Sequence, residues 1–108
     1  MKLGTTHHID CAHFLPGHAK CGQLHGHTYK AEVIIEGDNK DGMVLDFADL
    51  KKAVNDVLAD YDHKSLNDFL AYPSVENICE MLQARLREKL AFRFTIRVWE
   101  GAGKWAEL

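Results

Sequence analysis

Hydrophobic and polar residues alternate in three stretches of the chain. The alternation covers residues 2 to about 14, residues 27 to about 36 and residues 92–99, and it is most regular in the last of these. A period of two is typical of a β-strand that buries one face. Residues 104–108, which follow a Gly-Ala-Gly turn, are expected to form a short fourth strand.

Two other stretches have apolar residues at helical spacing. One runs from about residue 47 to 60 after Asp46, and the other from about 75 to 90 after Ser74; both preceding residues suit a helix N-cap. The order strand, strand, helix, helix, strand, strand indicates an α+β fold, with a four-stranded antiparallel sheet and both helices packed on one face. The length predicts a single domain over residues 1–108.

The predicted sheet has two uncovered edges and one polar face. The face away from the helices carries residues such as Glu32, Arg93, Thr95 and Arg97. Unpaired strand edges promote association with other chains. We therefore expect a homo-oligomer in which the edges of several sheets pair, for example in a wide barrel.

The composition limits the possible partners. A formal charge of −3 and 13 scattered Lys and Arg residues argue against nucleic acid. No apolar run approaches the roughly 20 residues of a membrane helix, and no signal peptide is evident, so we expect a cytoplasmic protein without membrane contact. Three cysteines without a Cys-x-x-Cys pair argue against a disulfide framework, and Cys11 and Cys79 are expected to be buried thiols.

Three histidines form the main candidate for chemistry, and we call them the histidine cluster: His13, His25 and His27. The last two are two residues apart, so an extended backbone points both imidazoles to one side, and a hairpin of the first two strands would bring His13 beside them. Three imidazoles leave one position of a tetrahedral zinc open, as in catalytic sites. Cys21 is interpreted as a base next to this metal. The remaining histidines of this region are expected at the surface: His7, His8 and His18.

Six ordered motifs resemble the 6-pyruvoyltetrahydropterin synthase and 6-carboxytetrahydropterin synthase (QueD) family, which has the tunnelling fold, or T-fold. The motifs cover nearly the whole chain: residues 9–13, 21–29, 42–47, 62–63 with 66–67, 73–77 and 98–100. The spacing Cys-x-x-x-His-Gly-His resembles the carboxy branch, which serves the queuosine and deazapurine pathway. Ile9, Ser74 and Gly101 depart from residues that are common in the family, and these departures concern the pterin contacts.

The resemblance implies a role for each candidate residue. The histidine cluster would bind Zn²⁺, Cys21 would be the catalytic base, and Asp62 with His63 would form a second acid-base element. Glu100 would hold the pterin ring. Two of these assignments have simpler alternatives, because the Asp62-His63 pair could cap the preceding helix and Glu100 could be a solvated strand end.

Ser74 and Glu76 are further candidates for contact with the pterin. Each has an alternative at the start of the second helix, Ser74 as the N-cap and Glu76 as a partner in the cap. The resemblance also implies trimers that stack into hexamers, with active sites between subunits. This agrees with the expectation that the sheet edges pair.

The implied reaction converts 7,8-dihydroneopterin triphosphate to 6-carboxy-5,6,7,8-tetrahydropterin and releases acetaldehyde and triphosphate, which makes the protein a carbon–carbon lyase. Two sister reactions would keep the site: elimination of triphosphate to 6-pyruvoyltetrahydropterin, and aldol cleavage to 6-hydroxymethyldihydropterin. The loop length before His25 argues against the first, and the absence of glutamate between Pro16 and His27 argues against the second. Outside enzymes, the alternatives are a non-catalytic zinc-containing pterin binder and a structural zinc with Cys21 as its fourth ligand.

Overall fold

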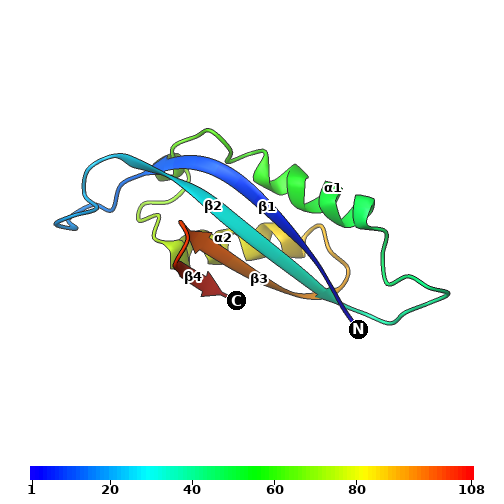
Figure 1. Cartoon of the computed structure of the whole chain (residues 1–108). Coiled ribbons are helices and arrows are strands. Elements are labelled where there is room, and N and C mark those ends of the chain that lie inside the picture. Colours follow the sequence, from blue (N-terminus) through cyan, green and yellow to red (C-terminus); the bar gives the residue numbers. More distant parts are fainter.

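One antiparallel sheet of four strands carries both α-helices on one face (Figure 1). The computed structural model describes residues 1–108. The strands lie in the order β1 (Lys2–His13), β2 (His25–Glu36), β3 (Arg93–Glu100) and β4 (Lys104–Glu107). The helical segments are α1 (Phe47–Leu58), η1 (Leu66–Asp68) and α2 (Val75–Arg87). The predicted fold class and order of elements are confirmed.

The core lies between the sheet and the two helices. The odd-numbered residues are buried from Thr5 to His13 in β1 and from Tyr29 to Ile35 in β2, on the face toward the helices, as the alternation predicts. The fully buried members of the core include Val33 and Ile35 of β2, Leu50 and Val54 of α1, and Leu86 of α2. Burial of this apolar surface holds the helices on the sheet and leaves the other face to solvent and polar groups.

Both helices begin where the sequence predicts and end earlier. The Asp46 carboxylate accepts the Ala48 N–H at 2.8 Å, and the Ser74 hydroxyl accepts the Asn77 N–H at 3.2 Å. The predicted ends near residues 60 and 90 are wrong, since α1 ends at Leu58 and α2 at Arg87. The apolar spacing continues past each end, but the backbone tightens into turns with bonds over three residues.

His7 is buried, so its predicted place at the surface is wrong. It is an odd-numbered residue of β1 and is 8% exposed. One ring nitrogen lies 2.8 Å from the Thr5 hydroxyl, and the other lies 2.9 Å from the Asn55 side-chain oxygen. Burial lowers the pKa of His7, and the bond to Asn55 opposes this shift only in part. His8 and His18 are exposed, as predicted.

The two cysteines that were predicted to be buried thiols are confirmed as such. Cys11 and Cys79 are 5% and 1% exposed, and neither forms a disulfide. The Cys11 thiol donates to the Tyr61 carbonyl at 3.2 Å. Burial raises the pKa of Cys11 to about 11, so this thiol stays protonated at neutral pH.

The face of the sheet away from the helices carries paired charges. Arg97 contacts Glu107 at 2.8 Å and Glu32 at 4.0 Å, and Lys30 lies 3.2 Å from Glu32. The Lys30 ammonium also lies over the Trp99 ring at 4.4 Å. These contacts confirm the polar face that the sequence predicts. Within one chain, the outer edges of β1 and β4 have no strand beside them. Neither α-helix is both long enough and apolar enough to cross a membrane.

Candidate metal centre and active site

The histidine cluster lies at the loop end of the β1–β2 hairpin. In the strand register, His13 lies opposite His25, and Cys11 lies opposite His27. Side chains alternate along a strand, so the three imidazoles project from the helix-facing side of the sheet, beyond the last residues of the core. The hairpin therefore brings together the three histidines that the sequence predicts to meet.

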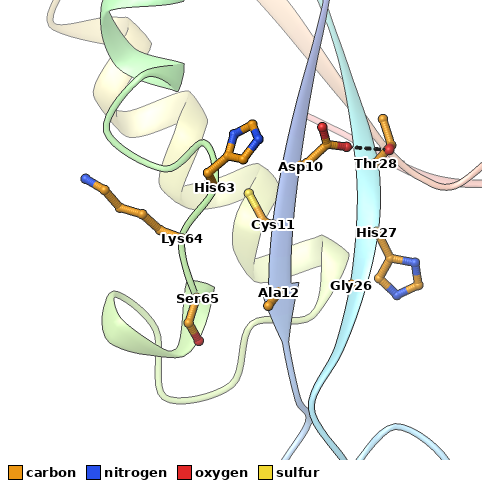
Figure 2. A pocket seen from close by; sticks show the side chains of 9 residues that line it. All are labelled: Asp10, Cys11, Ala12, Gly26, His27, Thr28, His63, Lys64 and Ser65. Carbon is orange, nitrogen blue, oxygen red and sulfur yellow. Dashed lines mark hydrogen bonds between the residues drawn. The ribbon is translucent and has the colours of Figure 1, made fainter.

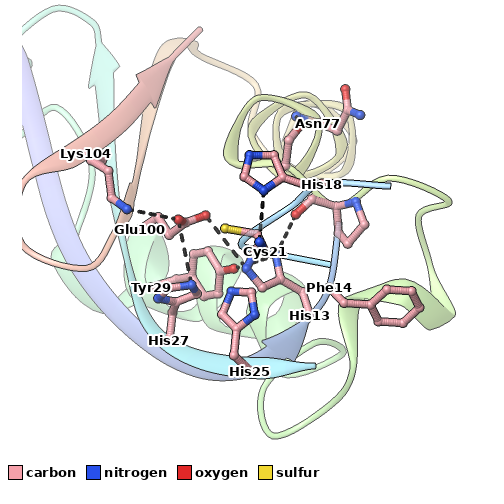
Figure 3. A network of polar contacts seen from close by, with 12 residues as sticks. His13, Phe14, His18, Cys21, His25, His27, Tyr29, Asn77, Glu100 and Lys104 are labelled. Atoms are coloured by element: carbon pink, nitrogen blue, oxygen red, sulfur yellow. Dashed lines mark hydrogen bonds and ion pairs between the residues drawn. The ribbon is translucent and has the colours of Figure 1, made fainter. Parts of the chain in front are cut away.

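The three imidazoles are close enough to contact one small ion. The centre of the His13 ring lies 4.6 Å from the centre of the His25 ring and 5.0 Å from that of the His27 ring. The centres of the His25 and His27 rings are 4.8 Å apart. One ligand nitrogen from each ring lies within 4.8 Å of the others. Figure 3 shows the rings facing one another, with Glu100 pointing toward them.

Backbone carbonyls orient two of the rings. The Nδ1 atom of His13 lies 2.8 Å from the Pro73 carbonyl, and that of His25 lies 2.7 Å from the Gln23 carbonyl. A carbonyl only accepts, so in the neutral rings each Nδ1 carries the proton and each Nε2 presents a lone pair. Metal-bound histidines are commonly held in this way by an outer hydrogen bond.

A divalent cation would pair with the Nε2 atoms of the cluster. The Nε2 atoms of His13 and His27 are buried and have no hydrogen-bond partner. Burial lowers the pKa of His27, against the opposing effect of Glu100, and this favours the neutral ring that binds metals. An unpaired buried polar atom is costly, and a metal ion would remove that cost. The residues therefore fit a three-histidine metal site of the kind that Zn²⁺ occupies.

Cys21 lies beside the histidine cluster. It lines a cavity of about 310 Å³, which we call the Cys21 cavity, together with His25, His27 and Glu100. Its side chain is partly exposed, in contrast to the buried Cys11. A thiol that opens into a cavity next to a metal site has the place that a base acting on a bound substrate requires.

A compact loop holds Cys21 in this position. The ring of His18 accepts the backbone N–H of Cys21 at 2.9 Å and that of Lys20 at 3.2 Å. The backbone of Gly22 passes so close to the His18 carbonyl that a Cβ atom there would lie 2.5 Å from it. His18 therefore organises the loop, a role that its exposure alone does not indicate.

Asp62 and His63 form a pair, and His63 opens on a different cavity. The His63 Nδ1 atom lies 3.0 Å from the Asp62 carboxylate, and the His63 side chain is 77% exposed. Asp62 accepts the Asp10 N–H at 2.9 Å, and the His63 N–H donates to the Asp10 carbonyl at 2.7 Å. His63 adopts a positive φ of 60°, so these contacts fix an unusual backbone conformation.

The cavity beside His63, which we call the His63 cavity, measures about 560 Å³. Figure 2 shows His63 and Lys64 on one side of β1, and Thr28 and His27 on the neighbouring strand. Cys21 is not among the residues that line it. One chain therefore brings Cys21 to the histidine cluster but keeps the Asp62-His63 pair apart from Cys21.

The residues predicted to bind the pterin lie in different settings. Glu100, at the end of β3, borders the Cys21 cavity. Ser74 is the N-cap of α2, and Glu76 is an exposed residue in the first turn of that helix. Two lysines of this cavity, Lys20 and Lys104, were not predicted, because lysines scattered along the sequence give no signal.

A family model described as 6-pyruvoyl tetrahydropterin synthase matches residues 2–108. The chain belongs to this family. The match confirms the family and the expectation of an enzyme.

Relatives and solved structures agree with this assignment. A protein of Archaeoglobus fulgidus, named putative 6-carboxy-5,6,7,8-tetrahydropterin synthase, is 46% identical over 109 residues, which cover 100% of this chain and 95% of the relative. Dihydroneopterin monophosphate aldolase of Pyrococcus furiosus is 40% identical over 82 residues, 73% of this chain and 72% of the relative. The structure of Caenorhabditis elegans 6-pyruvoyl tetrahydropterin synthase matches with a TM-score of 0.90 at 21% identity, covering 100% of this chain and 94% of that one, and it supports the fold.

Proposed function

We propose that the protein is a 6-carboxytetrahydropterin synthase. It converts 7,8-dihydroneopterin triphosphate and water to 6-carboxy-5,6,7,8-tetrahydropterin, acetaldehyde and triphosphate, a step of the queuosine and deazapurine pathway. The observation that carries this proposal is the cavity shared by Cys21, Glu100 and two members of the histidine cluster, His25 and His27. The name of the Archaeoglobus fulgidus relative supports the choice of product.

The residues of the Cys21 cavity and the neighbouring His13 take complementary roles. His13, His25 and His27 would hold Zn²⁺, which when bound would supply Lewis-acid stabilisation of negative charge on the substrate side chain. Cys21, as the thiolate, would take a proton from that side chain. The Glu100 carboxylate would accept two parallel hydrogen bonds from the 2-amino group and the ring N–H of the pterin.

Asp62 and His63 act on a substrate held by a neighbouring subunit in this proposal. The exposed His63 borders a cavity that Cys21 does not line, and the free edges of β1 and β4 offer a way for subunits to associate. Asp62 would orient the imidazole, and His63 would move a second proton. The assembly would be a trimer or a hexamer with its active sites between subunits.

Ser74 and Glu76 have supporting roles in the same proposal. The Ser74 hydroxyl starts α2, and the preceding Pro73 carbonyl orients the metal-facing ring of His13. The start of α2 therefore supports the cluster directly. Contact of Ser74 and Glu76 with the pterin would come from this same helix start.

A second candidate function is aldol cleavage, which would yield a 6-hydroxymethyl pterin. The Pyrococcus furiosus relative carries the name dihydroneopterin monophosphate aldolase and is 40% identical over most of this chain. The loop that precedes His27 has Cys21 and no glutamate between Pro16 and His27. A thiol base in this position favours the first candidate.

Mass spectrometry of the products tests the proposal. Zinc-loaded protein is incubated separately with 7,8-dihydroneopterin triphosphate and with the monophosphate. We expect 6-carboxytetrahydropterin and acetaldehyde from the triphosphate. A hydroxymethyl product from the monophosphate would establish the aldolase, and a pyruvoyl product would establish the eliminating branch. Tight pterin binding without any product would leave a non-catalytic binder.

A further inference from the structure

Glu100 lies closer to the histidine cluster than pterin binding alone requires. One carboxylate oxygen is 3.7 Å from the His27 Nε2 atom, and the other is 3.9 Å from the His13 Nε2 atom. These are two of the three buried side-chain nitrogens that have no hydrogen-bond partner, and the third is Nε1 of Trp99. The Glu100 side chain itself is only 15% exposed (Figure 3).

The strand pairing fixes Glu100 in this place. In the sheet register it lies between Tyr29 of β2 and Lys104 of β4. The Lys104 ammonium is 3.5 Å from one carboxylate oxygen, but that lysine is 73% exposed. An exposed cation is a weak partner for a carboxylate, so the lysine does not account for the direction in which Glu100 points.

The contact between Glu100 and a neutral His13 ring is unfavourable without a cation. Nδ1 of His13 donates to the Pro73 carbonyl, so a neutral ring has a lone pair at Nε2. That lone pair faces an oxygen of Glu100, which only accepts when it is ionised. Two acceptors face each other in a buried setting, and a positive ion between them would reverse the repulsion.

The spacing also suits two ligands of one ion. Ligand atoms that lie 2.0–2.2 Å from a tetrahedral zinc are about 3.4 Å apart from one another. The observed separations of 3.7 and 3.9 Å are a few tenths of an ångström longer, and each involves a different oxygen of the carboxylate. Ligation therefore requires a rotation of the Glu100 side chain that brings its oxygens closer to the histidine nitrogens.

We propose that Glu100 is the fourth ligand of the metal when no pterin is bound. This rests on the proposed function for the metal and for the pterin contact. The carboxylate closes the position that three histidines leave open, and it turns to the pterin edge when substrate arrives. Glu100 thereby couples binding of the pterin to the opening of the fourth coordination position of the metal.

Metal binding by the pterin-free protein tests this proposal without reference to turnover. Protein stripped of metal is titrated with Zn²⁺ in competition with a chromophoric chelator, and Co²⁺ is added to a second sample to record its visible spectrum. Glu100→Gln should weaken Zn²⁺ binding about 10- to 100-fold and change the Co²⁺ bands. Glu36→Gln, which removes an exposed carboxylate at the far end of β2, should change neither.

A shorter carboxylate separates ligation from the effect of charge. Glu100→Asp keeps the negative charge and shortens its reach by one methylene, so ligation predicts altered Co²⁺ bands in this variant too. It also carries the test if circular dichroism shows that Glu100→Gln does not fold. Co²⁺ bands identical to those of the wild type in the folded variants would overturn the proposal. Absence of turnover by the wild type would instead overturn the proposed function and leave the metal result standing.

Discussion

His7 and His13 lie on the same strand, on the same face, and both are buried, yet their surroundings differ. Both ring nitrogens of His7 have partners within the fold, Thr5 on one side and Asn55 on the other. His13 has a partner only at Nδ1, and its Nε2 atom is unpaired. In the middle of the β1–β2 hairpin, the ring nitrogens of His7 are paired within the fold. At its loop end, the Nε2 atom of His13 is unpaired.

This difference separates the part of the hairpin with a structural role from the part with a functional role. A fold pairs its buried polar groups because leaving them unpaired costs free energy. Where several unpaired nitrogens gather at one place, an external group is the simplest reason for them. The two cysteines follow the same division: each borders a cavity, but Cys11 is buried with its thiol bonded to the Tyr61 carbonyl, whereas Cys21 is partly exposed beside the histidine cluster.

The largest difference in turnover is expected between substitutions of these two cysteines. Cys21→Ala should lower turnover about 100- to 10,000-fold, because it removes the base, while zinc content stays unchanged. Cys11→Ala should keep turnover per folded molecule and lose stability instead. Product formation and metal content are measured for both variants. Loss of zinc from Cys21→Ala would contradict the assignment and indicate a structural fourth ligand.

Substitution of His63 tests whether one active site combines Cys21 of one subunit with His63 of another. His63→Gln should lower turnover by about 100-fold or more, because it removes the second proton carrier. When inactive His63→Gln and Cys21→Ala chains are unfolded, mixed in equal amounts and refolded, sites built from two subunits should recover about a quarter of the wild-type activity. Mixtures without recovered activity would place both residues of each site in one chain.

A smaller effect is expected in the middle of the hairpin. His7→Ala should lower the free energy of unfolding by about 1–3 kcal/mol, because the buried Thr5 hydroxyl loses its partner. The neighbouring exposed residue offers a control, His8→Ala, which should have little effect. Urea unfolding of metal-free protein measures both. Loss of activity without loss of stability in His7→Ala would contradict its structural role.

The same residue predicts a pH dependence. Burial lowers the pKa of His7 in the folded chain, so below about pH 6.5 the unfolded chain takes up a proton that the folded chain resists. The wild type should therefore lose stability as the pH falls below this value, and its advantage over His7→Ala should shrink. Urea unfolding at pH 8 and pH 5.5 checks the sign. An advantage that is equal at both values would contradict the prediction.

Local patterns made much of the fold predictable. The alternation in β1 and β2 predicted that His13 lies beside His25 and His27, and the residues Asp46 and Ser74 marked both helix starts. The burial of His7 could also have been predicted, because it shares its parity along β1 with Ile9 and the other inward residues.

Other features depend on contacts that no local pattern encodes. The Pro73 carbonyl reaches His13 across 60 residues of sequence. The place of His63, on a cavity that Cys21 does not line, follows from how the turn after α1 folds back onto Asp10. Whether Cys21 meets the Asp62-His63 pair of another subunit depends on the oligomeric assembly. Neither the spacing of the motifs nor the structure of a single chain can therefore predict it.

The zinc content of two matched variants tests the central claim most directly. Wild-type protein, His7→Ala and His13→Ala are loaded with Zn²⁺, freed of excess metal and analysed by atomic emission. We expect an equimolar amount of zinc in the wild type and in His7→Ala, and a large loss in His13→Ala with the fold retained. Equal zinc in all three proteins would contradict the account, because the unpaired nitrogen of His13 would then not mark a metal centre.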